Sequence, residues 1–168
     1  ACTDDGYLAF TGDFSFSIWF KPESTRDGML VGKYAGPGER AYALMVVGTT
    51  THIELRLDNA AGDETAVEWD QDLVDANQYH LVITYDASAH TAELYVNGIS
   101  KGTKDGVYTA IDDVTAMFQV GGSSVLGSQD GIIDELGAWD RPLTATEVTT
   151  LYNGGAGLPY YMFPALFP

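Results

Sequence analysis

Apolar and polar residues alternate with a period of two in several short stretches of this chain. The clearest is FSFSIWFKP at residues 14–22, where Phe and Ile occupy every second position and Pro22 ends the run. Because successive side chains of a β-strand point to opposite faces, this alternation predicts a strand with one face in a core. Gly, Pro, Asn and Asp, which favour turns, separate the stretches.

Similar signals predict about ten strands along the chain. In RAYALMVV, residues 40–47, both alternating sets are apolar, so this strand is expected in the middle of a covered sheet. HIELRLD, residues 52–58, alternates instead, which predicts one polar face. The Asn97–Gly98 pair predicts a type I′ hairpin turn. Other strands are predicted at 28–34, 79–86, 92–96, 118–122 and 131–139, with a short one that ends at Trp69.

One segment near the end of the chain has the signals of a helix. Pro142 precedes it, Thr144 is a suitable N-cap, and Glu147 stands three residues later, as a capping box requires. Gly154 and Gly155 can end the helix. Its apolar stripe consists of Val148, Leu151 and Tyr152.

Many strands and one late helix predict an all-β fold. Strands that are far apart in sequence are expected to pair, which favours an antiparallel two-sheet sandwich or jelly roll with one short C-terminal helix. The length of 168 residues is enough for one domain with a proper core and too short for two ordinary ones. We expect this domain to occupy residues 1–158.

The last ten residues, 159–168, differ from the domain. Their sequence PYYMFPALFP is apolar and contains three prolines, so it cannot form a regular helix or a central strand. An exposed tail of this kind would be a sticky patch. Either the tail packs across the domain surface, or it contacts a partner protein or another copy of the chain.

The chain is strongly acidic. It has 24 Asp and Glu against 8 Lys and Arg, a formal charge of −16, which argues against nucleic acid or an anionic membrane as a partner. The acidity serves solubility, calcium binding or both. No stretch reaches the roughly 18 apolar residues of a membrane span. The one cysteine, Cys2, excludes a disulfide within the chain, and an Ala at position 1 suggests a piece of a longer protein.

Four segments taken together resemble a known family. They are FSFSIWFKP, LVGKY, YHLVITYDASAHTAELYVNGISKG and GIIDELGAWDRPLTATEVTTLYNGG. In order and spacing they resemble the laminin G-like jelly-roll modules of the concanavalin A-like lectin and glucanase superfamily, over residues 5–155. The resemblance implies two curved antiparallel sheets with the short helix packed outside. The opening strand that many relatives have before DDGYLAF is missing or reduced, and the tail has no counterpart.

The resemblance also implies a place and a partner. Modules of this type are mostly attached to extracellular enzymes, adhesins and particle surfaces, where they bind glycans, glycoproteins or other proteins. The catalytic members use two carboxylates on one strand with an Asp between them, and this spacing is absent here. The nearest pair, Glu54 and Asp58, encloses Arg56, which we expect to hold both acids ionised. We therefore predict that the protein is not an enzyme.

A calcium site is a further implication of the resemblance. Relatives often hold a structural calcium where an Asp of the late strand meets carbonyls near the N-terminus; Asp134 matches this position, and Asp5 is a possible neighbour. Strict alternation places Asp134 in one row with Ile132 and Leu136, and Glu135 on the other face, which predicts a buried Asp134 carboxylate. The alternative is that Asp134 accepts backbone N–H groups and holds no metal.

Sugar binding usually requires an exposed aromatic ring beside polar groups. Trp69 is the best candidate because it ends a short strand beside the polar loop DQDLVDANQ, although simple packing at a sheet edge is the alternative. Trp19 and Trp139 are expected to pack, Trp19 beneath the helix. The polar groups expected beside Trp69 are Glu54, Arg56, Asp58, Asp70 and Asp72.

Two hypotheses follow. The first is a non-catalytic recognition module, extracellular or on a particle or cell surface, that binds a carbohydrate and is stabilised by calcium. The second is a structural, assembly or adhesion subunit of a surface filament, virion or cell-surface protein that uses the tail at 159–168 for protein contacts.

Overall fold

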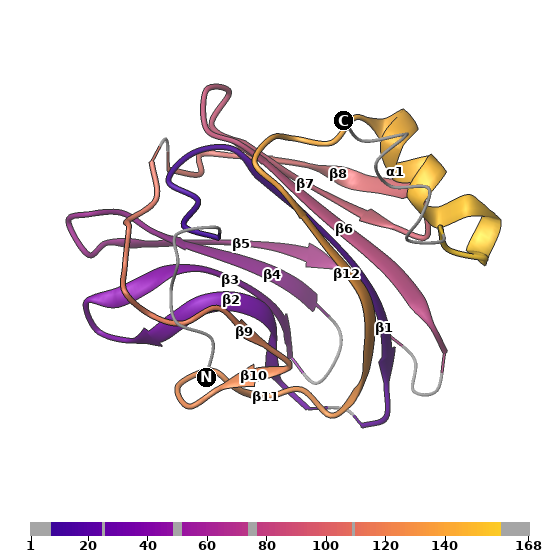
Figure 1. Ribbon diagram of the computed structural model, residues 1–168, viewed down its shortest axis with the longest axis horizontal. Helices are drawn as coiled ribbons and strands as arrows, with labels where there is room; N and C mark the ends of the chain where they lie inside the picture. Colours follow the sequence, from indigo (N-terminus) through magenta and orange to yellow (C-terminus); the bar gives the residue numbers. More distant parts are fainter. Residues whose placement is uncertain (1–7, 25, 49–51, 74–76, 109, 159–168) are drawn as a thin grey trace.

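The computed structural model confirms the predicted all-β fold: two sheets pack face to face, and one short α-helix lies near the C-terminus (Figure 1). It describes residues 8–24, 26–48, 52–73, 77–108 and 110–158. The five-stranded sheet contains, in spatial order, β12 (Gly131–Trp139), β1 (Phe14–Pro22), β6 (Tyr79–Asp86), β7 (Thr91–Val96) and β8 (Ile99–Asp105).

The second sheet has seven strands. Its spatial order is β10 (Gly122–Ser123), β11 (Gly127–Ser128), β2 (Gly28–Gly36), β3 (Glu39–Val47), β4 (His52–Asp58) and β5 (Glu64–Asp70), with β9 (Gln119–Val120) also paired to β2. Paired strands run antiparallel in both sheets, except that β11 runs parallel to β2. β12 and β9 therefore lie on one side of the sandwich, and β8 and β5 lie on the other.

Aromatic residues of β1 form the centre of the core. The ring centroid of Phe14 lies 5.2 Å from those of Phe16 and Tyr85, and 5.3 Å from that of Tyr42. These four side chains come from both sheets, so they join the two layers. The alternation predicted for β1 is confirmed on its inner face, where every second residue from Phe14 to Phe20 is buried.

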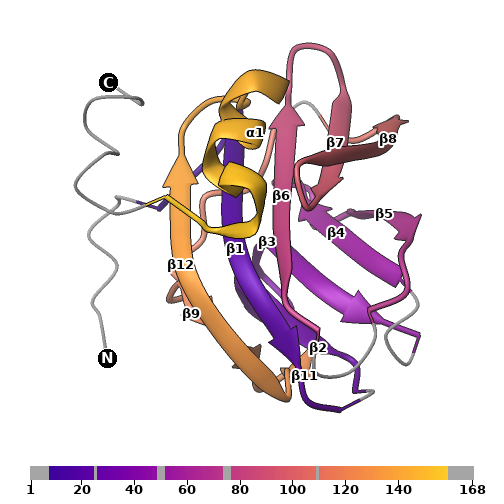
Figure 2. The same cartoon turned by 90° about the vertical axis from the view of Figure 1, so that its right-hand side faces the viewer.

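The outer face of the five-stranded sheet is covered by α1 (Ala145–Tyr152), followed by a 3₁₀ turn (Asn153–Gly155). Figure 2 shows α1 lying across β1 and β6. The predicted capping box is present, because the Thr144 side chain accepts from the Glu147 N–H and the Glu147 carboxylate accepts from the Thr144 N–H. The apolar cluster beneath the helix consists of Val82, Tyr95, Leu143, Val148, Leu151 and Leu158. In the described part of the chain, no helix is long and apolar enough to cross a membrane.

The turn between β7 and β8 matches its prediction. Asn97 and Gly98 have φ angles of 53° and 76°, as a type I′ turn requires at both central positions. A Cβ atom at Gly98 would lie 3.1 Å from the Tyr152 ring, so this glycine also lets the hairpin approach α1.

Strand β12 departs from strict alternation. Ser17 pairs with Gly137 and Trp19 pairs with Asp134, so two steps along β1 correspond to three along β12. The extra residue forms a β-bulge, and Glu135 within it has a left-handed φ of 49°. A bulge shifts the side-chain alternation by one residue.

The predicted row of residues around Asp134 is therefore wrong. Asp134 lies opposite Trp19 on the outer face of the sheet, whereas Ala138 lies opposite Phe16, a core residue. Asp134 is also exposed rather than buried. Its Oδ1 accepts a hydrogen bond of 2.8 Å from the Glu135 N–H, so it accepts a backbone N–H as the alternative prediction proposed, but at the surface.

Candidate functional site

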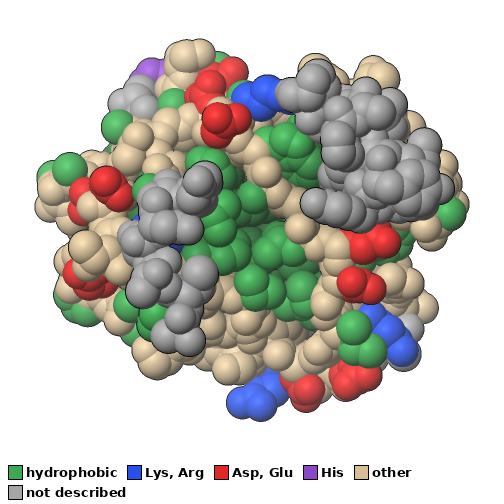
Figure 3. Space-filling model, in the orientation of Figure 1, with side chains coloured by type: hydrophobic (Ala, Val, Ile, Leu, Met, Phe, Trp, Pro, Cys, Tyr) green, Lys and Arg blue, Asp and Glu red, His purple; other side chains and the backbone are tan. Residues whose placement is uncertain are grey.

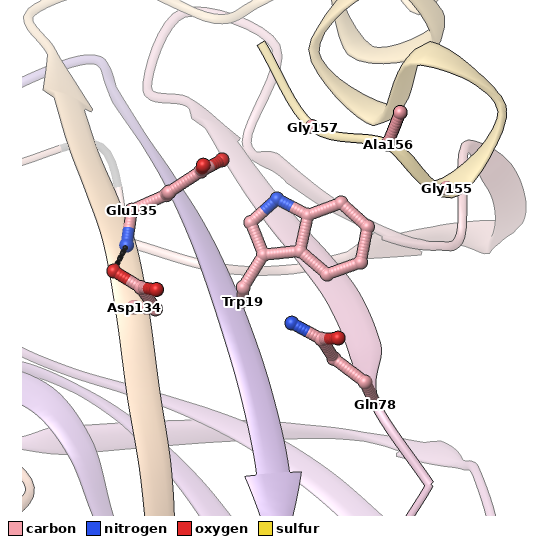
Figure 4. A pocket seen from close by; sticks show the side chains of 7 residues that line it. All are labelled: Trp19, Gln78, Asp134, Glu135, Gly155, Ala156 and Gly157. Carbon is pink, nitrogen blue, oxygen red and sulfur yellow. Dashed lines mark hydrogen bonds between the residues drawn. The ribbon is translucent and has the colours of Figure 1, made fainter. Parts of the chain in front are cut away.

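A pocket of about 120 Å³ opens between β12, β1 and the loop that follows α1 (Figure 4). Its lining consists of the side chains of Trp19, Gln78, Asp134 and Glu135 together with Gly155–Gly157. Gln78 directly precedes β6, so the pocket is built from distant parts of the sequence. The two carboxylates accept hydrogen bonds, the indole N–H donates one, and the amide does both.

The bulge of β12 builds one wall of this pocket. In a regular strand, Asp134 and Glu135 would point to opposite faces of the sheet. Because the backbone turns into the left-handed region at Glu135, both carboxylates line the same pocket. Figure 4 shows them side by side on β12.

Trp19 supplies the floor of the pocket. It is 6% exposed, and its ring centroid lies 5.0 Å from that of His80 and 6.0 Å from that of Tyr152, which confirms its predicted position under the helix. Among the described residues, no group accepts a hydrogen bond from the Trp19 indole N–H. Figure 4 shows its nitrogen on the side of the ring that faces Glu135 and Gly157. The N–H is thus a nearly buried donor available to a ligand.

His80, which lies near Trp19, adds no charge to the site at pH 7. Burial lowers the pKa of His80 to about 4, so its imidazole is neutral at pH 7. Its Nε2 lies 2.8 Å from the Ser17 Oγ. The acidic groups of the pocket are the Asp134 and Glu135 carboxylates of β12.

The loop after α1 closes the pocket. Gly157 has a φ of 68°, and a Cβ atom there would lie 2.7 Å from Oε2 of Glu135. Only glycine permits this approach of the backbone to the carboxylate. The Asn153 side chain holds the loop, because its Nδ2 donates to the Gly157 carbonyl at 2.8 Å.

The same fold and chain pattern are found in a described family. A family model for the concanavalin A-like lectin/glucanases superfamily matches residues 1–149. The chain belongs to this superfamily. A search of curated proteins finds no match.

Solved structures show the fold of this concanavalin A-like domain in other proteins. A candidate carbohydrate-binding protein from Bacteroides ovatus superposes with a TM-score of 0.70 at 17% identity, over 91% of this chain and 43% of that one. Domain 4 of the extracellular arabinanase AbnA from Geobacillus stearothermophilus, solved with arabinotriose, superposes with a TM-score of 0.65 at 21% identity. The match covers 85% of this chain and 68% of that one. A heptameric pentraxin from Limulus polyphemus superposes with a TM-score of 0.62 at 17% identity, over 84% of this chain and 70% of that one. At these identities the likeness concerns the fold.

In this concanavalin A-like domain, Trp69 is not an exposed platform, so that prediction is wrong. Its side chain is 2% exposed and belongs to the core. Trp69 lies opposite Ile53 on the inner side of its sheet, and its indole Nε1 donates to the Gly102 carbonyl of β8 at 2.7 Å. The alternative, packing at a sheet edge, is what the structure shows.

The predicted polar row of β4 is present, but two of its three side chains are buried. Glu54 and Asp58 are 4% and 2% exposed. Glu54 contacts the Arg56 guanidinium, and Arg40 Nε lies 3.1 Å from Asp58 Oδ1. Because this row faces away from the core that holds Trp69, the structure does not bring the two together.

Arg56 does not keep the pKa values of the two acids low. Burial raises the pKa of Asp58 to about 6, despite the opposing charge of Arg40. Burial also raises the pKa of Glu54, and Arg56 offsets only part of this effect. A raised pKa suits a general acid, but side chains this buried are out of reach of a substrate.

The remaining predicted site residues lie apart from the pocket. Asp70 is 96% exposed with Oδ1 3.0 Å from His52 Nε2, and Asp72 is exposed on the following loop. Asp5 lies outside the described residues, as does the tail at 159–168. Within the ranges that the structure describes, no three His, Cys, Asp or Glu side chains gather as a metal site. The calcium site of Asp134 and Asp5 stays a prediction.

Sequence reasoning missed Glu135, Gln78 and Gly155–Gly157 as pocket residues. Gly137 was the available signal, because a glycine inside a strand often marks a bulge or a close contact. A Cβ atom at Gly137 would lie 2.4 Å from the Trp139 ring. Gln78 and the glycine loop had no local signal, since only tertiary packing brings them to β12.

Proposed function

We propose that this domain is a non-catalytic, extracellular carbohydrate-recognition module, and that the pocket around Trp19 and Glu135 binds the sugar. The observation that carries the proposal is the Trp19 indole N–H, which has no acceptor among the described residues and lies beside the carboxylates of Asp134 and Glu135. A sugar hydroxyl both donates and accepts hydrogen bonds, so neighbouring hydroxyls can accept from Trp19 and donate to Glu135. The carbohydrate-binding proteins among the structures of the same fold support this assignment.

The arrangement of the acids supports binding rather than hydrolysis. Glycoside hydrolases place two carboxyl groups on either side of the scissile bond. Asp134 and Glu135 are consecutive residues on one wall of the pocket (Figure 4). Both can accept hydrogen bonds from one ligand, but they do not flank it.

Binding can be tested with a panel of soluble oligosaccharides that includes arabinotriose, by calorimetry and by NMR titration of the full chain. Trp19→Phe keeps the ring and removes the N–H, and we expect affinity to fall about tenfold. Glu135→Gln removes a charged acceptor, and we expect a loss of about ten- to a hundredfold. Asp72→Asn is the matched control, because it removes an exposed carboxylate outside the pocket, and it should bind like the wild type.

The proposal fails if no oligosaccharide shifts the resonances of the pocket residues, or if both pocket variants bind as tightly as Asp72→Asn. Thermal melting of each variant shows whether a loss of binding reflects a loss of folding. The predicted calcium is tested by thermal melting as well. If Asp134 and Asp5 hold the ion, a chelator lowers the melting temperature and added calcium restores it; an unchanged midpoint would remove calcium from the proposal.

A further inference from the structure

The pocket around Trp19 is small. Its volume is about 120 Å³, whereas pockets that enclose a whole drug-sized ligand have about 300–1,000 Å³. An oligosaccharide is too large to enter, so the pocket recognises one group on one sugar unit together with the atoms beside that group. The chemistry of the lining decides which group it is.

The charged side chains of the lining are both acidic. Asp134 and Glu135 line the pocket from β12, and no Lys or Arg is among the residues that line it. The nearby His80 is neutral at pH 7, because burial lowers its pKa to about 4. Lys21 follows Trp19 by two positions on β1, but it lies outside the lining. Within the described part of the chain, the two carboxylates therefore have no cationic partner.

Glu135 is the better placed of the two acids for a ligand. Asp134 Oδ1 accepts the Glu135 backbone N–H, whereas no described residue donates a hydrogen bond to the Glu135 carboxylate. Carboxylate oxygens accept and do not donate, so they favour a ligand group that is rich in donors. An ammonium group has three donors and a positive charge, and hydrogen bonds between charged groups are roughly twice as strong as neutral ones.

Trp19 is an independent observation that points to a ligand. Its side chain is 6% exposed, and its indole N–H, which has no acceptor among the described residues, faces Glu135 in Figure 4. Because this N–H only donates, the ligand has to place an acceptor beside its cation. A hydroxyl on the neighbouring carbon is such an acceptor. The side chain of a lysine in a partner protein suits the pocket less well, because it has an ammonium and no acceptor.

The charge of the whole molecule also favours a cationic ligand. The net charge is −16, and acidic side chains are more widespread than basic ones on the face in Figure 3. This field attracts cations and repels sugars that carry carboxylate, sulfate or phosphate groups. It speeds the encounter with a cationic sugar, and the pocket supplies the specificity.

We infer that the pocket recognises a sugar unit with a free amine beside a hydroxyl, as in glucosamine. The inference rests on the proposed function and names its ligand class. The ammonium donates to Glu135 and Asp134, and the oxygen of the neighbouring hydroxyl accepts from the Trp19 N–H. A unit with a hydroxyl or an acetylated amine in place of the free amine lacks the charge and binds more weakly.

Two matched trisaccharides test the inference. Linear trimers of glucosamine and of glucose with the same linkages differ only in the amine, which replaces one hydroxyl on each unit. We expect the glucosamine trimer to bind at least about tenfold more tightly in calorimetry and to shift the Trp19 indole N–H resonance. The full chain is titrated at about pH 6, where amines are protonated. NaCl at about 150 mM screens charges beyond about 8 Å.

Variants separate the pocket from the net charge. Glu135→Gln should lower the ratio of the two affinities at least about fivefold. Asp72→Asn removes the same charge outside the pocket and should leave the ratio unchanged. Trp19→Phe should weaken both trimers by a similar factor, because the indole N–H contacts a hydroxyl. An equal fall of the ratio in Glu135→Gln and Asp72→Asn would overturn the inference, because it would show attraction to the net charge alone.

The remaining outcomes distinguish the inference from the proposed function. Equal affinity of the two trimers at the pocket would overturn the inference and leave the proposed function standing, as would tighter binding of a sugar without an amine. If no sugar of any kind binds, both fail. Butylammonium is the last probe, because it carries an ammonium without a hydroxyl. If it binds the pocket as tightly as the glucosamine trimer, the site fits lysine side chains and the sugar assignment is overturned.

Discussion

At the scale of single residues, His80 links the pocket floor to the pH dependence of folding. Its ring lies between Ser17, Trp19 and Tyr152, where burial lowers its pKa to about 4. The unfolded chain binds a proton near pH 6.5 and the folded chain does not, so His80 stabilises the fold above pH 6.5 and this stability is lost as the pH falls towards 4.

The expected loss from His80 is about 2–3 kcal/mol in the free energy of unfolding between pH 7 and pH 4.5. Urea denaturation of the wild type and His80→Gln at both pH values measures it, because the glutamine does not titrate. Because the pKa of Asp58 is raised in the folded state, its contribution to stability increases as the pH falls. This contribution is the same in both proteins, so it cancels when their pH dependences are compared. The same pH dependence in both proteins would contradict a buried, neutral His80.

Single residues also mark the limit of sequence reasoning. The alternation of β4 correctly separated Glu54, Arg56 and Asp58 from the core, but it could not show that packing would bury two of them. Trp69 read as a surface residue because a polar loop follows it. The burial of Trp69 depends on β8, a strand of the other sheet, where the Gly102 carbonyl accepts a hydrogen bond from the Trp69 indole N–H.

At the scale of elements, the N-terminus of α1 depends on one hydroxyl. Thr144→Ala removes the side chain that accepts from the Glu147 N–H, and we expect it to lower the free energy of unfolding by about 1 kcal/mol. Thr149→Ala, the same change inside the same helix, should be nearly neutral or slightly stabilising, since alanine favours a helix interior. Chemical denaturation compares the two; equal effects would mean that the cap contributes nothing.

Elements defined by local sequence were predicted well. The capping box of α1, the Asn97–Gly98 turn and the alternation of β1 each need only a few neighbouring residues. The bulge at Glu135 was not predicted, because it arises from the register of β12 against β1, a strand more than a hundred positions earlier. One unforeseen residue was enough to misplace Asp134 and to hide the pocket.

For the whole molecule, the net charge of −16 opposes the compact state through repulsion among acidic groups. Raising NaCl from about 20 mM to about 500 mM at pH 7 should raise the melting temperature by a few degrees, about 1 kcal/mol of stability. Near the isoelectric point of about 4.1 the net charge vanishes, so the gain should vanish too. A similar gain at both pH values would point to a general salt effect on burial.

The sandwich architecture and the late helix followed from pattern and resemblance together, but the order of strands did not follow from pattern alone. Pairs such as β1 with β12 join the two ends of the domain, and their alternation patterns fit several partners equally well. The register of β12 against β1, which creates the bulge at Glu135, is a property of this assembled order. No local stretch of sequence encodes it.

The two sides of the sandwich are unequal. On one side, the Trp69 indole of β5 is fastened to the Gly102 carbonyl of β8, so the outermost strands of the two sheets are joined there by a nearly buried bond. On the other side, β12 and β9 have no such tie among the described residues. We therefore expect the two sheets to be held together more firmly at Trp69 than between β12 and β9.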